Sequence, residues 1–216
     1  MPTHRKTGIA RPDARRAGPG NKHEDGRRQR SEKSREKIIS AMFLLIGGGS
    51  MNVSAAEVAR ESGVSIRTVF RQFEEVDEIY RQIIARLEEE LMPTLLAPYQ
   101  SRGWKKQVAE MIERRSSIYE YVMPFKVSSA VRRFKSIPLM DDHARFVTLE
   151  RAALKAILPS EITENPTLLA ALDNAASFES WRRLRQDSGL NPSSAHDTML
   201  YTVQALLGSA RSGSDS

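Results

Sequence analysis

The sequence contains no cysteine, which excludes disulfide bonds, thiolate metal sites and cysteine nucleophiles. It also has no long apolar run, because the longest, from Ile38 to Ile46, is interrupted by Ser40 and is far too short to span a bilayer. The basic residues at the start are not followed by the apolar segment of a secretory signal. From these absences we expect a soluble cytoplasmic protein.

Signatures of enzymes are also missing. The sequence has no glycine-rich phosphate loop in a strand-to-helix context and no nucleophile-elbow motif, and Gly47 to Gly49 follow a predicted helix. The cluster Asp141, Asp142, His143 is the best metal candidate, but adjacent residues on a helix point in different directions and cannot easily bind one ion. We therefore expect no enzymatic activity, no metal site and no cofactor.

Positive charge is concentrated at the N-terminus. Residues 1–30 contain nine basic and three acidic residues, so this segment carries the whole net charge of +6. It is rich in glycine, proline and arginine and has no apolar period, which predicts disorder. Such a segment suits a polyanion, most commonly nucleic acid, although a solvated extension that only aids solubility has the same composition.

Helical periodicity begins after this segment and continues to the end of the chain, and no stretch alternates like a strand. Further helices are predicted over 75–96, 103–121, 125–136, 139–158, 166–187 and 193–210, with prolines at or near most breaks. Pro93 should kink or end the first of these. We expect an all-α fold of about nine helices. Its parts are a disordered basic arm (1–30), a helix-turn-helix domain (31–80), a helical effector-binding and dimerisation domain (81–211) and a disordered tail (212–216).

The segment from Ser54 to Phe73 has the features of a helix-turn-helix. Ser54 and Glu57 form a predicted capping box, and Ser65 is placed to cap the second helix. Ala59 is small enough for two helices to cross, and Gly63 tolerates the positive φ that the turn needs. The second helix would enter the major groove of DNA by its N-terminus. A plain αα-corner uses similar residues and is the alternative.

Residues 34–84 resemble the DNA-binding domain of the tetracycline-repressor (TetR) family. The resemblance rests on five short stretches: Ile38-Ile-Ser-Ala-Met-Phe-Leu, Ala56-Glu-Val-Ala, Ser62-Gly-Val-Ser, Thr68-Val-Phe-Arg-Gln-Phe and Asp77-Glu-Ile-Tyr. It implies a homodimeric regulator, usually a repressor, that binds a near-palindromic double-stranded operator under the control of a small-molecule effector. Two positions depart from the family pattern, where Phe70 replaces a common tyrosine and Val76 a common lysine.

Expected DNA contacts gather on the second motif helix and the basic arm. Arg67 and Thr68 are placed to reach base edges, and arginine can bond two atoms of one guanine. Because Phe70 cannot donate a hydrogen bond to a phosphate, Arg27, Arg28 and Arg30 are expected to compensate as an arm along the minor groove or phosphates. The full expected set is Arg28, Arg30, Ser54, Ser65, Ile66, Arg67, Thr68, Phe70, Arg71 and Gln72.

The C-terminal part would bind the effector and the second subunit, as the resemblance implies. Candidate pocket residues are Trp104, Met111, Tyr119, Met123 and Phe146. Candidate dimer residues on the last two predicted helices are Leu168, Leu172, Ala175, Met199, Val203 and Leu206. Each of these could instead be ordinary core. Two other functions remain open, a helical ligand-binding or adaptor protein without specific DNA recognition, and a non-specific nucleoid-associated protein.

Overall fold

The computed structural model describes residues 22–212, and over this range the chain is helical with no strand, which confirms the expected all-α class. The elements are α1 (Lys22–Gly47), α2 (Ala55–Ser62), α3 (Ile66–Gln72), α4 (Val76–Leu96), α5 (Trp104–Arg133), α6 (Ile137–Lys155), α7 (Ser160–Thr163), α8 (Pro166–Ala175), α9 (Phe178–Arg182), the π-helical η1 (Arg183–Asp187) and α10 (Pro192–Ser212). Within this range no helix combines the length and the apolarity that crossing a membrane requires. Residues 1–21 of the expected arm and 213–216 of the expected tail lie outside the described residues.

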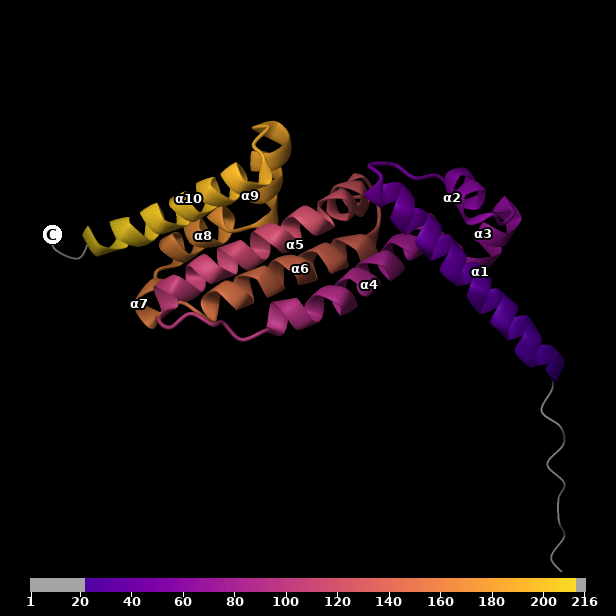
Figure 1. The fold of residues 1–216 in the computed structure, drawn as a ribbon, viewed down its shortest axis with the longest axis horizontal. Helices are drawn as coiled ribbons and strands as arrows, with labels where there is room; N and C mark the ends of the chain where they lie inside the picture. The colour runs from indigo at the N-terminus through magenta and orange to yellow at the C-terminus, as the bar shows by residue number, and fades with distance from the viewer. Residues whose placement is uncertain (1–21, 213–216) are drawn as a thin grey trace, which may run out of the picture.

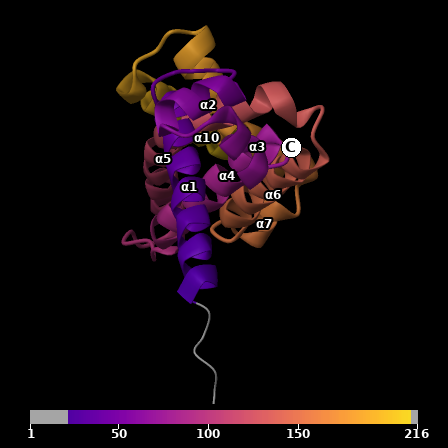
Figure 2. The same cartoon turned by 90° about the vertical axis from the view of Figure 1, so that its right-hand side faces the viewer.

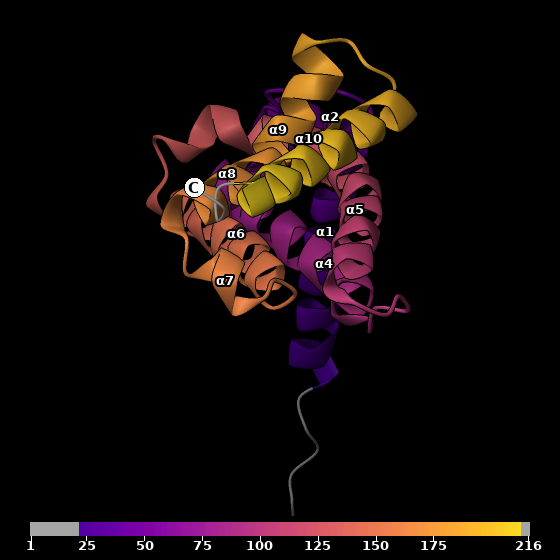
Figure 3. The same cartoon turned by 90° about the vertical axis from the view of Figure 1, so that its left-hand side faces the viewer.

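The described part of the molecule is elongated, with α1, α2 and α3 at one end and α10 with the C-terminus at the other (Figure 1). Helices α4, α5 and α6 run lengthwise between the two ends (Figure 1). Seen from the C-terminal end, α10 lies across α8 and α5 (Figure 3). The arrangement separates the candidate DNA-binding residues from the C-terminal helices by the length of the molecule.

Helix α1 starts earlier than the sequence predicts. It begins at Lys22, so residues 22–30 of the expected disordered arm are helical. This part of the prediction was wrong because the prolines of residues 1–30, and all their glycines except Gly26, lie before Lys22. Arg28 pairs with Glu32 one turn later at 3.0 Å, and such charged residues with good helix propensity extend a helix that is already anchored by its later turns. The helix ends at Gly47, as the run of glycines predicts.

The apolar core of the described residues consists of two clusters. The N-terminal cluster is built mainly from α1 to α4 and includes the fully buried Ile38, Met42, Val58, Phe73 and Ile83. It is completed by two residues far along the chain, Phe125 on α5 and Leu139 on α6. The C-terminal cluster joins α5, α6, α8, α9 and α10 around Trp181. Because α5 contributes to both clusters, it connects the two ends of the molecule.

Proline and cap residues divide the C-terminal helices differently from the prediction. Helix α4 continues past Pro93 to Leu96, and α5 runs through Pro124 as one helix where two were expected. A proline removes only one backbone hydrogen bond, and the burial of Val122 and Phe125 on either side of Pro124 holds the helix against the core. Conversely, the expected helix over 166–187 is interrupted because the Ser177 side chain accepts a hydrogen bond from the Ser180 N–H and caps a new helix.

Candidate nucleic-acid interface and ligand cavity

Helices α2 and α3 are joined by the turn that the sequence predicts. The Ser54 N–H donates to the Glu57 carboxylate at 2.9 Å, and the Ser54 hydroxyl accepts from the Glu57 N–H at 3.3 Å, which completes the capping box. The Ser54 hydroxyl, which donates to the Glu57 carboxylate at 2.7 Å, and the Ser54 N–H together lower the pKa of Glu57. Gly63 ends α2 with a φ of 66°, and the Ser65 hydroxyl accepts from the Thr68 N–H at 3.1 Å to begin α3. Local hydrogen bonds therefore fix both helix starts.

The outer face of α3 combines exposed apolar and cationic side chains. Ile66 and Phe70, one turn apart, are 49% and 54% exposed. Arg67 and Arg71 lie next to them, are exposed, and form no hydrogen bond or ion pair with the residues that the structure describes. The inner face of the same helix is anchored by Val69, which is buried. A rigid helix that presents two unpaired guanidinium groups beside apolar surface suits base edges, thymine methyl groups and phosphates.

Two of the expected DNA contacts on α3 are engaged inside the protein. The hydroxyls of Thr68 and Ser65 share a hydrogen bond of 2.9 Å. The side-chain amide of Gln72 exchanges hydrogen bonds of 3.0 and 3.1 Å with Ser31 on α1. Contact of either residue with a base would have to replace these bonds, whereas Arg67 and Arg71 have none among the described residues to replace.

Arg28 and Arg30 lie on the N-terminal part of α1, which continues past α3 and away from the body of the molecule (Figures 1 and 2). Arg28 is paired with Glu32, and the Arg30 guanidinium donates to the Gly26 carbonyl at 2.9 Å. Arg27, Arg28 and Arg30 were expected along the minor groove or the phosphates, and the first alternative is corrected, because a helix of this width does not fit the narrow minor groove. Contact of these arginines with phosphates stays a prediction.

Arg35 positions α3, a role that no sequence pattern indicates. Its guanidinium donates to the Gln72 carbonyl at 2.9 Å and to the Glu78 carboxylate at 2.8 Å. The guanidinium carbon also lies 4.2 Å from the centre of the Phe73 ring. The side chain therefore joins α1 to the end of α3 and the start of α4. In the sequence, Arg35 is one of many charged residues in a polar stretch, which is why no pattern distinguished it.

We expect Arg35→Gln to lower the free energy of unfolding by about 1–2 kcal/mol, since charge-assisted hydrogen bonds are lost and a carbonyl at the helix end loses its partner. Urea unfolding followed by circular dichroism measures the change. Arg71→Gln is the matched control, because its exposed guanidinium has no partner among the described residues and should change stability by about 0.5 kcal/mol or less. Equal effects of the two substitutions would contradict the anchoring role.

A cavity of about 220 Å³ lies between α4, α5 and α6. Two of the expected pocket residues, Tyr119 and Phe146, line it, but Trp104, Met111 and Met123 do not. These three side chains pack in or against the C-terminal cluster away from this lining, and their part in effector binding stays a prediction. The sequence analysis also missed the charged residues of the lining, which are Glu88, Arg115, Lys126, Arg133, Asp142, His143 and Glu150.

The buried carboxyl group of Glu150 forms one wall of this cavity. It accepts hydrogen bonds from the Tyr119 hydroxyl and, at 3.0 Å, from the Phe178 N–H. Burial raises the pKa of Glu150, and burial also raises the pKa of Tyr119 well above its ordinary value. Arg115 donates to the Glu150 and Ala176 carbonyls, which ties α5 to α6 and α8 behind the wall.

Lys126 also lines the cavity, with its ammonium 3.7 Å from the centre of the Phe146 ring and 5.7 Å from that of Phe178. Burial lowers the pKa of Lys126 to about 8. The nearby His143 has a pKa lowered by burial and by the positive charges of Lys126 and Arg133. The cavity surface therefore carries a partly desolvated ammonium held over aromatic faces, beside the guanidinium groups of Arg115 and Arg133.

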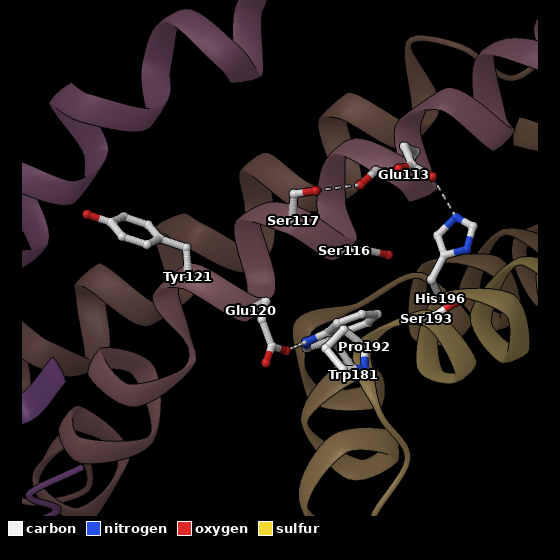
Figure 4. Close-up of a pocket in the computed structure, with 9 residues that line it drawn as sticks. All are labelled: Glu113, Ser116, Ser117, Glu120, Tyr121, Trp181, Pro192, Ser193 and His196. Carbon is white, nitrogen blue, oxygen red and sulfur yellow. Dashed lines mark hydrogen bonds and ion pairs between the residues drawn. The ribbon is translucent and has the colours of Figure 1, made fainter. Parts of the chain in front are cut away.

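A wider, more open groove of about 630 Å³ lies between α5 and the start of α10 (Figure 4). Its carboxylates already have partners: Glu113 lies 3.1 Å from His196, and Glu120 accepts from Trp181 (Figure 4). Glu120 also accepts from Arg185. The hydroxyls of Ser116 and Ser117 donate to carbonyls of their own helix. Since these carboxylates and hydroxyls are satisfied within the protein, this groove offers a ligand less than the cavity does.

The expected dimer residues divide into two groups. Leu172, Met199 and Val203 are at most 1% exposed within the single chain and belong to the C-terminal cluster, so their assignment to the dimer surface was wrong. Leu168, Ala175 and Leu206 are partly buried at the edge of that cluster. Helical periodicity places core and interface residues on adjoining faces, and only packing distinguishes them.

Asp142 and His143 turn to different partners, as neighbours on a helix must. Asp142 pairs with Arg145 at 3.0 Å and lies 3.8 Å from Arg81. His143 contacts the Arg133 guanidinium at 3.1 Å. These contacts tie α6 to α4 and α5 beside the cavity.

Comparison with known proteins gives a structural likeness. No protein-family model and no curated protein matches the sequence. Among solved structures, the chain resembles a transcriptional regulator from Rhodococcus sp. Rha1, with a TM-score of 0.62 over 83% of this chain and 96% of that one. The two proteins share a fold. Because the sequences are 18% identical, the likeness extends to the fold alone.

Proposed function

We propose that the chain is a sequence-specific DNA-binding transcriptional regulator of the TetR family that acts as a repressor. The observation that carries this proposal is the outer face of α3, where Arg67 and Arg71 are exposed beside Ile66 and Phe70 without a partner among the described residues. A helix of this composition, capped at its N-terminus and braced by α1 and α2, suits the major groove. The fold shared with a crystallised transcriptional regulator supports the same function.

The proposed regulator is a homodimer on a near-palindromic operator, because one recognition helix gives weak binding. The outer face of α10 supports a dimer surface: Tyr201 is 74% exposed and is followed along the helix by the exposed small residues Ala205 and Gly208. An exposed aromatic beside small residues allows close approach of another helix. Leu168, Ala175 and Leu206 would border this surface.

A small molecule in the cavity would control DNA binding. Helix α4 contributes Ile79 and Ile83 to the N-terminal cluster and Leu91 and Leu95 to the cavity. Phe125 on α5 lines the cavity, and its ring centre lies 4.5 Å from that of Phe43 on α1. A ligand that favours one arrangement of α4 and α5 would thereby shift the spacing of the two recognition helices by its differential affinity.

Selection of binders from a random duplex DNA pool at moderate salt tests the proposal. We expect an inverted repeat, and we expect Arg67→Ala to relax the preference at one base pair, at a cost of about 1–3 kcal/mol in discrimination. Arg102→Ala removes the same charge in the loop between α4 and α5 and should leave the selected sequence unchanged.

Two results would contradict the proposal. Recovery of no motif, with binding that disappears as salt rises, would leave a non-specific nucleic-acid binder. An unchanged motif in Arg67→Ala would show that the assignment of Arg67 to a base edge is wrong.

A further inference from the structure

Two cationic side chains at the cavity surface have unused hydrogen-bonding capacity. The Lys126 ammonium makes no hydrogen bond or ion pair with the residues that the structure describes, and its near neighbours are the aromatic faces of Phe146 and Phe178. The Nε of Arg133 is buried without a partner, although its Nη1 contacts His143. Buried donors are nearly always satisfied, because each unsatisfied one costs free energy. Both groups therefore favour an acceptor that the protein alone does not supply.

The acidic groups around these cations are already engaged. Glu88 accepts from Arg145 at 2.7 Å, and Asp142 accepts from the same guanidinium at 3.0 Å. Glu150 is held by Tyr119 and the Phe178 N–H. Glu179, at 3.6 Å from Arg133, lies 3.3 Å from Arg182 as well. None of these carboxylates lies within ion-pair distance of the Lys126 ammonium, so an anion from outside has an open position there.

The rest of the lining is mostly apolar and extends along α4. Ile84, Leu87, Leu91, Met92, Leu95 and Leu96 all line the cavity. The stretch from Ile84 to Leu96 is about 18 Å long at 1.5 Å per residue. Met92, Leu95 and Leu96, at the end of α4, are also among the exposed large apolar side chains of the surface. The cavity thus has a cationic part at Lys126 and an apolar strip that reaches the surface.

We propose that this cavity binds an amphipathic carboxylate, with the carboxylate on Lys126 and Arg133 and an alkyl tail along α4. The inference rests on the proposed function in that it names the chemical class of the effector. The tail would replace water at apolar side chains, and the carboxylate would supply the acceptor that Lys126 and the Arg133 Nε lack. Helix α4 carries this apolar strip and also contributes to the N-terminal cluster. A ligand on the strip would therefore contact the helix that links the cavity to the candidate DNA-binding end.

Calorimetric titration of the purified full chain with octanoate, without DNA, tests the inference. Octanamide has the same tail without the charge, and octylammonium has the opposite charge. We expect octanoate to bind, octanamide to bind at least about tenfold more weakly, and octylammonium not to bind. Lys126→Met should weaken octanoate about 10- to 100-fold and leave octanamide unchanged. Lys106→Met, an exposed lysine outside the cavity, is the matched control and should change neither.

Absence of octanoate binding, equal binding of octanoate and octanamide, or an unchanged octanoate affinity in Lys126→Met would each overturn the inference. Arg133→Gln gives the same comparison if Lys126→Met does not fold. Because the titration contains no DNA, its failure is distinguishable from failure of the proposed function. If octanoate binds but the DNA selection yields no inverted repeat, the proposed function fails and the ligand site stands. If the selection yields an inverted repeat but octanoate does not bind, the proposed function stands and the carboxylate site fails.

Discussion

Replacement of Trp181 by alanine is expected to lower the free energy of unfolding by about 3–5 kcal/mol, a large part of the stability of an ordinary domain. Trp181 is fully buried at the centre of the C-terminal cluster, and its indole N–H donates to Glu120 at 3.2 Å. The lost ring leaves a cavity that the surrounding helices cannot fill. Glu120 keeps its two hydrogen bonds from Arg185, so the expected loss comes from packing. Urea unfolding followed by circular dichroism measures it.

Trp104→Ala is the matched control, because the chain has two tryptophans and Trp104 packs against the same cluster from its edge. The same chemical change at a partly exposed position should cost clearly less, since fewer contacts are lost and the gap opens to water. Equal losses for the two variants would show that Trp181 does not organise this cluster.

Lys126→Met is expected to stabilise the ligand-free protein near neutral pH by up to about 3 kcal/mol. Burial lowers the pKa of Lys126 from 10.5 to about 8. Between these values the unfolded chain holds a proton that the folded chain has released, so the stability of the original protein rises with pH across this window. Below about pH 8 both states are protonated and the full cost of the buried charge is present. The methionine variant lacks both the cost and the rise.

Urea unfolding of both proteins between pH 7 and pH 10.5 gives the comparison. Tyrosines such as Tyr119, whose pKa is raised, lower stability at the upper end of this range, but they do so in both proteins and cancel in the difference. A difference that stays constant with pH would mean that the Lys126 ammonium is well solvated. A lysine that costs stability and still lies at a cavity surface fits the trade-off expected of a binding site.

The helix-turn-helix could be predicted from the sequence because its signals are local. Ser54 with Glu57, Gly63 and Ser65 each act within a few residues, through side-chain caps and a positive φ. The same local rules failed at Lys22, where α1 starts without an apolar period, and at Pro124, where tertiary packing carries α5 through a residue that usually ends helices. Structure that depends on short-range interactions could thus be predicted from the sequence, and structure that depends on long-range packing could not.

The ligand cavity could be predicted only in part for the same reason. Aromatic residues such as Tyr119 and Phe146 were expected inside, but Lys126 and Glu150 follow the pattern of a solvated helix surface. Both lie against Phe178 of α9, which is distant in the sequence, and no local pattern encodes that contact. The same holds for Leu172, Met199 and Val203, which were predicted at the dimer surface but are buried in the fold of the single chain.

Helices α4 and α5 belong to both ends of the molecule, and this limits how parts of the chain can be joined to parts of other proteins. The boundary expected at residue 80 falls inside α4, and the N-terminal cluster is completed by Ile83, Leu87, Phe125 and Leu139 beyond it. A fragment that ends at residue 80 would expose that apolar surface. A chimera that joins this N-terminal end to a foreign C-terminal part must therefore carry over the contacts of Phe125 and Leu139 as well. The N-terminal end therefore cannot be transferred as an independent unit, because residues of α5 and α6 complete its core.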